Sequence, residues 1–148
     1  MTREATSRCS WPLPRHEARR RALEVLYEAD LLRREISETL RRTLGDPHAS
    51  PLDDFARYLA GGVAERCEEI DALIATHARG WSVARMPVID RNILRLGVYE
   101  LLHAPDTPPA VVIDEAVELA KEMSTEDSPR YVNGVLSAVL RNRQLESG

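Results

Sequence analysis

The amino-acid sequence predicts an all-α protein, and two observations support this fold class. Between Ala110 and Leu140, apolar side chains twice recur at the i, i+3, i+4, i+7 spacing that gathers them on one face of a helix. The first series consists of Ile113, Ala116, Val117 and Ala120, and the second of Val132, Val135, Leu136 and Val139. In addition, no segment of the sequence alternates apolar and polar residues as a half-buried strand would.

A polar corner, residues 124–129, separates these two helices. Asp127 or Ser128 is expected to cap the second helix, because a short side-chain oxygen accepts hydrogen bonds from the N–H groups of a first turn. Pro129 suits that first turn, where its missing N–H costs nothing. The Asn133-Gly134 dipeptide is typical of a β-hairpin, but its flanks keep the helical period. We therefore expect Gly134 to mark a close approach between two helices.

The preceding chain has helical character in several segments. A first helix is expected over residues 15–33, with an apolar face formed by Ala18, Ala22, Val25, Leu26 and Ala29. Residues 37–44 predict a short helix or turn, which Gly45-Asp46-Pro47 ends. A long helix then runs from Leu52 to about His77 with its apolar residues on one side. After a break at Gly80, residues 82–85 are expected to form a single turn.

The segment 86–103 is the most apolar of the expected helices. Its apolar side chains surround most of the circumference and leave one polar edge, formed by Asp90, Arg91 and Glu100. A helix that is apolar nearly all round is a buried one, so we expect this helix at the centre of the fold. The sequence thus predicts one domain, residues 15–145, with halves at about 15–80 and 81–145, after a flexible tail, residues 1–14.

The composition is that of an ordinary soluble domain, with 148 residues, of which 43% are hydrophobic and 30% charged. No apolar run is long enough to cross a bilayer, and no signal peptide is apparent. A cytoplasmic protein without membrane contact is therefore expected. The two cysteines, Cys9 and Cys67, lie far apart in the sequence, so neither a disulfide framework nor a zinc site is expected.

The charge is unevenly distributed along the chain. The net charge is −4, yet the first 21 residues carry +4 and the remaining residues −8. A basic segment on an acidic body is the electrostatic pattern typical of a nucleic-acid-binding protein.

Cations and an aromatic ring share one stripe of the first helix. His16, Arg20, Leu23 and Tyr27 follow one another at helical spacing, and Arg15 and Arg19 border the apolar face. This pattern suits an unpaired nucleic-acid strand, because phosphates need positive charge and splayed bases need a flat partner. The same pattern also fits a solvated basic turn with Tyr27 packed on a neighbouring element.

No catalytic or cofactor-binding constellation is recognisable in the sequence. The nucleophile elbow, the phosphate-binding glycine loops and the zinc-protease helix motif are all missing. The four histidines are scattered, without a second histidine or cysteine at ligand spacing. We therefore expect no enzyme, no metal site and no cofactor.

Three groups of residues resemble the NusB family of transcription antitermination factors. The most specific group runs from Asp114 to Lys121, continues with Glu126-Asp127-Ser128 and ends with Tyr131 to Leu136. The other two groups are Arg15–Arg21 followed by Leu26-Tyr27, and Leu94-Arg95 followed by Tyr99-Glu100-Leu101. Together they cover nearly the whole chain from Arg15 to Leu140.

The resemblance implies a fold and a set of partners. The fold would be a compact helical domain of two packed three-helix bundles, and the protein would not be a catalyst. It would bind the single-stranded boxA element of nascent ribosomal RNA, pair with the ribosomal protein NusE and join the elongating RNA polymerase. Because some members of the family self-associate, a homodimer is an alternative state.

The resemblance also implies roles for individual residues. Arg15, Arg19 and Arg20 would contact phosphates, with His16 beside them on the same helix. Tyr27 and Tyr131 would stack on or flank bases. Asp127 would contact the edge of a base. Its alternative role, as the cap of the helix that follows, would not involve RNA. Asp90, at the start of the central helix, would lie near both the RNA and the partner, and the partner-binding residues would be Asp90 and its neighbour Arg91.

Two other functions remain open on the sequence alone. The chain fits a helical structural or interaction protein that dimerises through apolar faces. It also fits an accessory domain related to the NusB-like domain of some ribosomal RNA methyltransferases. No methyl-donor-binding α/β domain follows Gly148 in the sequence, so a self-sufficient methyltransferase is not expected.

Overall fold

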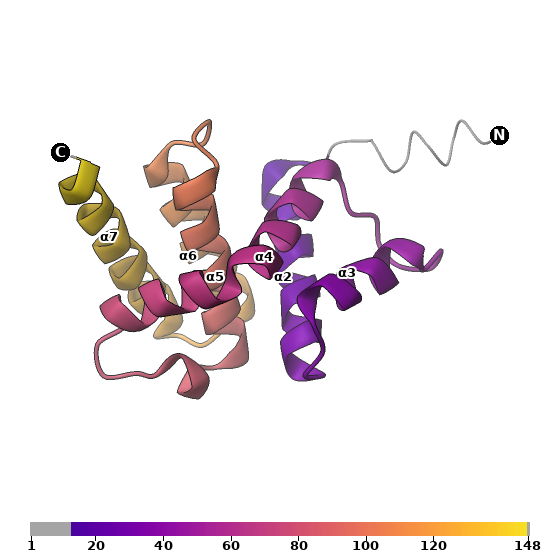
Figure 1. Cartoon of the computed structure of the whole chain (residues 1–148), viewed down its shortest axis with the longest axis horizontal. Coiled ribbons are helices and arrows are strands. Elements are labelled where there is room, and N and C mark those ends of the chain that lie inside the picture. Colours follow the sequence, from indigo (N-terminus) through magenta and orange to yellow (C-terminus); the bar gives the residue numbers. More distant parts are fainter. Residues whose placement is uncertain (1–12, 148) are drawn as a thin grey trace. The chain divides into compact units, whose positions relative to one another are not determined.

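The all-α prediction is confirmed in the computed structural model, which describes residues 13–147 (Figure 1). Within this range there is no strand. The helices are α2 (Arg15–Leu31), α3 (Ile36–Gly45), α4 (Asp54–His77), α5 (Val88–His103), α6 (Pro109–Met123) and α7 (Ser128–Ser147), with a 3₁₀ turn, η1 (Val83–Arg85), before α5. The tail expected at residues 1–14 lies outside the described residues, except for Leu13 and Pro14. None of the described helices combines the length and apolar character that crossing a membrane requires.

The chain divides into two compact units between Glu65 and Arg66, inside α4. Arg66 has non-helical backbone angles, φ −120° and ψ 21°, which mark a kink in this helix. The sequence pattern places the division near Gly80, where the helix ends. A kink leaves the apolar period of a helix nearly unchanged, so the pattern gives no sign of a division inside α4.

The N-terminal unit has a core of small and branched apolar side chains. The fully buried ones include Leu23 and Leu26 on α2 and Leu59 and Val63 on α4. Asp53 fixes the start of α4, because its carboxylate oxygens accept hydrogen bonds from the Ala56 N–H at 2.8 Å and from the Leu13 N–H at 2.9 Å. The first of these bonds is an N-cap, and the second holds the chain just before α2 beside the start of α4.

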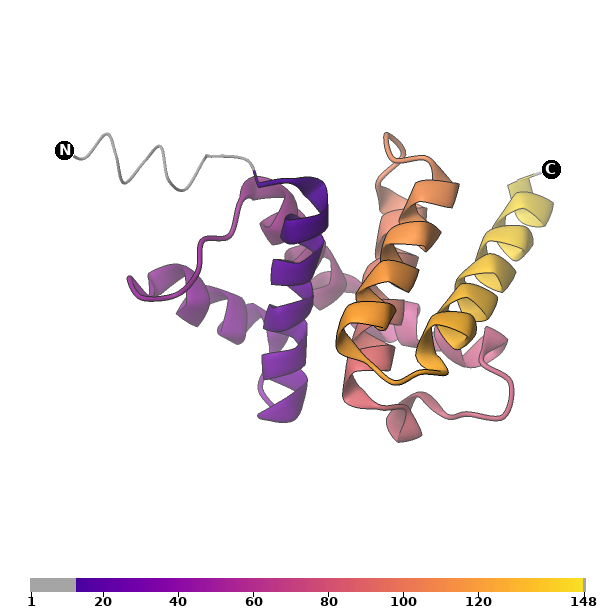
Figure 2. The same ribbon diagram turned by 180° about the vertical axis from the view of Figure 1, so that it is seen from behind.

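In the C-terminal unit, α5 packs against α6 and α7, which run antiparallel to each other (Figure 2). The expected burial of α5 is confirmed, since Ile93, Leu94 and Val98 are fully buried. Its expected polar edge is not exposed, because Asp90 and Glu100 are only 4% and 3% accessible. A buried carboxylate requires hydrogen-bond partners, and those of Asp90 come from the corner between α6 and α7.

The close approach between helices occurs at Gly97 of α5. A Cβ atom at this position would lie 2.7 Å from Cδ1 of Leu136 on α7. The expectation that Gly134 marks the close approach was wrong, because Gly134 is exposed and a Cβ atom there would meet nothing within 4 Å. The spacing of apolar residues predicts that Gly97 and Gly134 both lie within helices. It does not show which of the two faces a neighbouring helix.

Gly97→Ala and Gly134→Ala are expected to change stability in opposite directions. The first forces a methyl group against the buried Leu136 side chain, and overpacking of this kind costs about 1–3 kcal/mol. The second replaces an exposed helical glycine by the best helix former, which stabilises by about 0.5–1 kcal/mol. Urea unfolding of both variants checks the pair, and a Gly97→Ala protein as stable as the Gly134→Ala protein would contradict it.

Candidate nucleic-acid interface

The start of α2 concentrates positive charge. Arg15 and Arg20 are exposed, and Arg20 lies 4.0 Å from Glu24 in an ion pair whose two side chains are about half exposed. No side chain caps the helix, and Glu17 is the one acidic residue of its first turn. The N-terminus of a helix already carries a partial positive charge. Arginines at this position raise the local electrostatic potential further, so the start of α2 attracts anions more strongly than a helix N-terminus without arginines would.

Phe55 of α4 lies beneath two of these arginines. The Arg15 guanidinium carbon is 3.8 Å from the centre of the Phe55 ring, and that of Arg19 is 5.4 Å away. Both distances are within cation–π range. The Phe55 ring in turn stacks at 6.4 Å on Tyr58, which is 44% exposed. Phe55 is one of the apolar residues of the long helix expected from Leu52, and the sequence gives no sign of this contact because no spacing rule relates α4 to α2.

The predicted surface stripe on α2 is only partly present. Leu23 is fully buried and Arg19 is 5% accessible, so these two do not lie on an exposed stripe. His16 and Tyr27 are half-buried. Tyr27 follows Arg15 on the same helix by about 18 Å of axial rise, so α2 does not bring its ring next to the guanidinium of Arg15.

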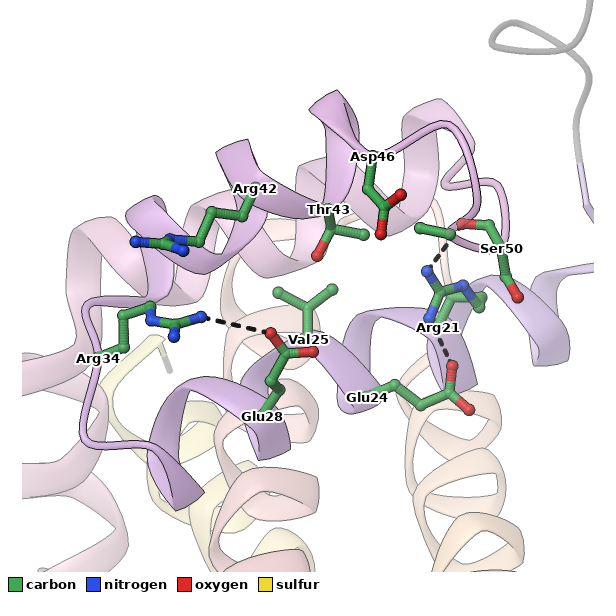
Figure 3. Close-up of a pocket in the computed structure, with 10 residues that line it drawn as sticks. Arg21, Glu24, Val25, Glu28, Arg34, Arg42, Thr43, Asp46 and Ser50 are labelled. Atoms are coloured by element: carbon green, nitrogen blue, oxygen red, sulfur yellow. Dashed lines mark hydrogen bonds and ion pairs between the residues drawn. The ribbon is translucent and has the colours of Figure 1, made fainter.

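Arg21 is half-buried, and its guanidinium is occupied by contacts within this unit. Its guanidinium donates to the Ser50 carbonyl at 2.9 Å and to the Pro51 carbonyl at 3.3 Å, and it pairs with Glu24. These bonds attach the loop before α4 to α2. Arg21 also lines a polar pocket of about 350 Å³ beside α2 and α3 (Figure 3).

Each of the three arginines that line this pocket is paired with a glutamate. Besides the Arg21 contacts, Arg34 lies 3.6 Å from Glu28, and Arg42 donates to Glu38 at 3.1 Å. Internal pairing leaves little attraction for a further anion, so the pocket is a weaker candidate than the start of α2.

In the C-terminal unit, the buried carboxylate of Asp90 holds the corner between α6 and α7. It accepts hydrogen bonds from the hydroxyl groups of Ser124 and Ser128, the latter at 2.8 Å. The third hydroxyl of the corner, that of Thr125, lies 2.8 Å from the Ser128 oxygen. Since the Ser124 and Ser128 protons both point to Asp90, Thr125 must be the donor to Ser128.

The cap expected at the start of α7 is therefore replaced by a tertiary contact. Ser128 is 2% accessible and is the first residue of α7, with its hydroxyl directed at Asp90. Asp127 is exposed, and its carbonyl accepts the Tyr131 N–H at 3.3 Å. Arg91, the residue after Asp90, is half-buried and donates to the Ala84 carbonyl at 3.2 Å.

A cavity of about 380 Å³ opens beside this corner. It is lined by Trp81, Met86, Pro87, Asp90, Thr125, Asp127, Ser128 and Tyr131. The rings of Trp81 and Tyr131 meet edge to face, with their centres 6.4 Å apart and their planes at 61°. The structure thus brings together Asp90, Asp127 and Tyr131 of the predicted residues, and adds Trp81, which directly follows the expected break at Gly80 and was not a predicted site residue.

The phenol of Tyr131 is the most unusual polar group of this cavity. Its oxygen is buried and has no hydrogen-bond partner within the described structure. Burial raises the pKa of Tyr131, and the negative charge of Asp90 raises this pKa further. The hydroxyl therefore stays protonated and available to donate.

The local backbone places Trp81 at the rim of the cavity. Gly80 has φ +82°, a left-handed conformation that glycine adopts without strain. The Trp81 N–H closes a turn onto the Ala78 carbonyl at 3.4 Å, directly after the end of α4. Trp81 is 51% exposed as a result.

Comparison with solved structures defines the class of fold. A crystal structure of NusB from T. maritima superposes with a TM-score of 0.77 at 33% identity, covering 90% of this chain and 98% of that one. The NusB chain in a crystal structure of the antitermination factors NusB and NusE with double-stranded RNA gives a TM-score of 0.74 at 33% identity, over 86% of this chain and 96% of that one. The fold is therefore that of a NusB-like helical protein.

Comparison of sequences agrees with the structural match. The NusB family model matches residues 16–141. The transcription antitermination protein NusB of Saccharopolyspora erythraea is 51% identical over 126 residues, which cover 84% of this chain and 85% of that protein. The chain belongs to the NusB family of transcription antitermination proteins, as the three groups of residues in its sequence predict.

Proposed function

We propose that this protein is a non-catalytic antitermination factor that binds RNA together with a NusE partner. Family membership and the related structure of NusB and NusE with RNA support this function. The observation that carries it is the exposed guanidinium of Arg15, which lies 3.8 Å above the Phe55 ring at the positive end of α2. A guanidinium held on a ring is oriented before binding, which reduces the entropy lost on contact with a phosphate.

The different exposures of the predicted residues support different parts for them in RNA binding. The exposed Arg15 and Arg20 would contact phosphates, with His16 beside them. Arg19 is nearly buried against Phe55, so its charge would act mainly through the local potential. Asp127 and Tyr131 would receive a base of the boxA element, and Tyr27 would flank a second one.

The remaining partners are part of the same proposal. NusE would bind near Asp90 and Arg91, and the assembly would act on the elongating RNA polymerase in the cytoplasm. Because Asp90 is buried and directed at Ser124 and Ser128, its contribution to a NusE surface would be to shape the corner. A homodimer remains an alternative state, which sedimentation with and without RNA distinguishes.

Replacing both Arg15 and Arg20 by alanine is expected to weaken binding of single-stranded boxA RNA about 10- to 100-fold. Each lost phosphate contact also makes the dependence of log K on log salt shallower by about 0.7, so the double variant should lose about 1.4 from this slope. Fluorescence anisotropy of labelled RNA at several salt concentrations, with and without NusE, measures both quantities.

Arg42→Ala is the matched control for this experiment. Arg42 is an arginine of the same unit, 61% exposed and paired with Glu38, so its removal changes the net charge without touching the start of α2. If Arg42→Ala weakened binding as much per charge removed as the double variant does, only overall charge would matter. Equal binding of unrelated RNAs would refute recognition of boxA.

A further inference from the structure

We propose that residues 1–12 of this chain dock on an uncovered face of the first half of α4, with the ring of Trp11 packed on Tyr58 beside Gly61. The contact lies within the N-terminal unit and is independent of RNA binding. It differs from the expectation that the N-terminal tail is flexible. Docking would give the chain that leads into α2 a second anchor, in addition to its hydrogen bond to the start of α4.

The uncovered face consists of Tyr58 and Gly61, which lie one turn apart on the same side of α4. Tyr58 is 44% exposed, although its ring stacks on the half-buried Phe55. A Cβ atom at Gly61 would meet nothing within 4 Å, so no described residue packs closely against this glycine. An exposed ring beside an open glycine forms a shallow apolar surface, on which a flat side chain can pack close to the helix backbone.

The described part of the chain begins beside this face. Pro14 has φ −52° and ψ 141°, so the backbone is extended at the residue before α2. The N–H of Leu13 donates to the Asp53 carboxylate at 2.9 Å, which places Leu13 at the start of α4. Residues 1–12 are therefore attached at the end of α4 from which Tyr58 is about one turn distant.

The length of the tail is sufficient for the contact. Tyr58 follows Asp53 by about 7.5 Å of axial rise, and Gly61 follows it by about 12 Å. Trp11 precedes Leu13 by two positions, and two extended residues span about 7 Å. The indole can therefore reach the Tyr58 ring. A group on the same chain is also present at a high effective concentration, which favours it over an equivalent group on another molecule.

The charges of the tail and of the helix are complementary. Two arginines and one glutamate precede Trp11 in the sequence. The exposed charged side chains on the first half of α4 are those of Asp54, Arg57 and Glu65, two acids and one base. The opposite net charges favour the tail as the occupant over an acidic segment of another protein.

Fluorescence of Trp11 tests the contact. The chain has two tryptophans, so Trp81→Phe leaves Trp11 as the only reporter in the otherwise complete protein. Trp11 should then emit at a shorter wavelength, and be quenched less by acrylamide, than the same tryptophan in a peptide of residues 1–14. Neither property should change with protein concentration, because the contact is within one chain.

Two substitutions on α4 should release Trp11, and a third should not. Tyr58→Ala removes the ring, and Gly61→Gln fills the space beside it. Each should move the emission and quenching of Trp11 to the values of the peptide. Because Gly61 faces open space, Gly61→Gln should do so without lowering the thermal midpoint. Leu44→Ala is the matched control, since Leu44 is 45% exposed in the same unit, and it should leave Trp11 unchanged.

Disulfide formation by Cys9 is a second test, which keeps Trp81. Cys9 precedes Leu13 by four positions and so reaches about 14 Å from it. In a protein with Arg57→Cys and Cys67→Ser, mild oxidation should join Cys9 to the new thiol within one chain, as mass spectrometry after proteolysis would show. Adding Trp11→Ser should slow this reaction, because the tail would then lose its contact with Tyr58.

Three results would overturn the inference. They are peptide-like emission of Trp11 in the Trp81→Phe protein, a disulfide that forms equally fast with and without Trp11→Ser, and an emission that shifts with protein concentration. The last result would mean that the tail of a second copy covers the face. None of them bears on the proposed function, which the RNA titrations test separately.

Discussion

Asp90→Ala is expected to lower the free energy of unfolding by about 3 kcal/mol. The carboxylate accepts hydrogen bonds from Ser124 and Ser128, and a hydrogen bond to a charged group contributes about 1.5–3 kcal/mol. Alanine would remove both acceptors and leave two hydroxyl groups in a site where Asp90 and Ser128 are only 4% and 2% accessible. Urea unfolding followed by circular dichroism measures the loss.

Asp90→Asn is the control that separates volume from hydrogen bonding. The amide has nearly the same shape, keeps one acceptor oxygen and presents an N–H₂ group to the other hydroxyl. It should therefore cost less than alanine but more than an exposed substitution. A loss below about 1 kcal/mol for Asp90→Ala would mean that the hydroxyl groups find other partners, and the corner would then not depend on Asp90.

Asp53→Ala is expected to destabilise the N-terminal unit by about 2–3 kcal/mol. Loss of an N-cap alone costs about 0.5–2 kcal/mol. Asp53 is 4% accessible and also accepts the Leu13 N–H at 2.9 Å, so alanine additionally frees the chain that leads into α2. Thermal unfolding and urea unfolding should both shift, and RNA affinity should fall with them because Arg15 lies just after this tether.

Its neighbour Asp54 provides a matched comparison. Asp54 is exposed in the first turn of α4, where a carboxylate contributes about 0.3–1 kcal/mol through the helix dipole. The two substitutions remove the same group from adjacent positions, so any difference reports the two hydrogen bonds of Asp53. Equal losses from both variants would contradict the assigned cap and tether.

The helices themselves could be predicted from the sequence to within a few residues. The expected helix over 15–33 ends at Leu31, the expected helix from Leu52 begins at Asp54, and the expected helix over 86–103 begins at Val88. Periodicity reports which face of a helix is apolar, and this information is local. The specific identification of the family likewise came from local runs of residues, above all the run that ends α6 and begins α7.

What could not be predicted depends on pairs of residues from different helices. The capping rule recognised Ser128 as a residue suited to a helix start, but its hydroxyl is directed to Asp90, 38 positions away in the sequence. Similarly, Arg19 was placed on the surface because its helical position borders the apolar face, whereas its guanidinium lies over Phe55. Phe55 and Trp81 were missed as site residues because their neighbours in space come from other elements.

The contact between Gly97 and Leu136 has a consequence for how this sequence can vary. Cβ of a larger residue at 97 would occupy the space that the ends of the Leu136 side chain now fill. The two positions therefore share a single volume, and growth at one requires shrinkage at the other. Among homologous chains we therefore expect the residues at positions 97 and 136 to change together. Where position 97 carries a residue larger than glycine, position 136 should carry a side chain smaller than leucine.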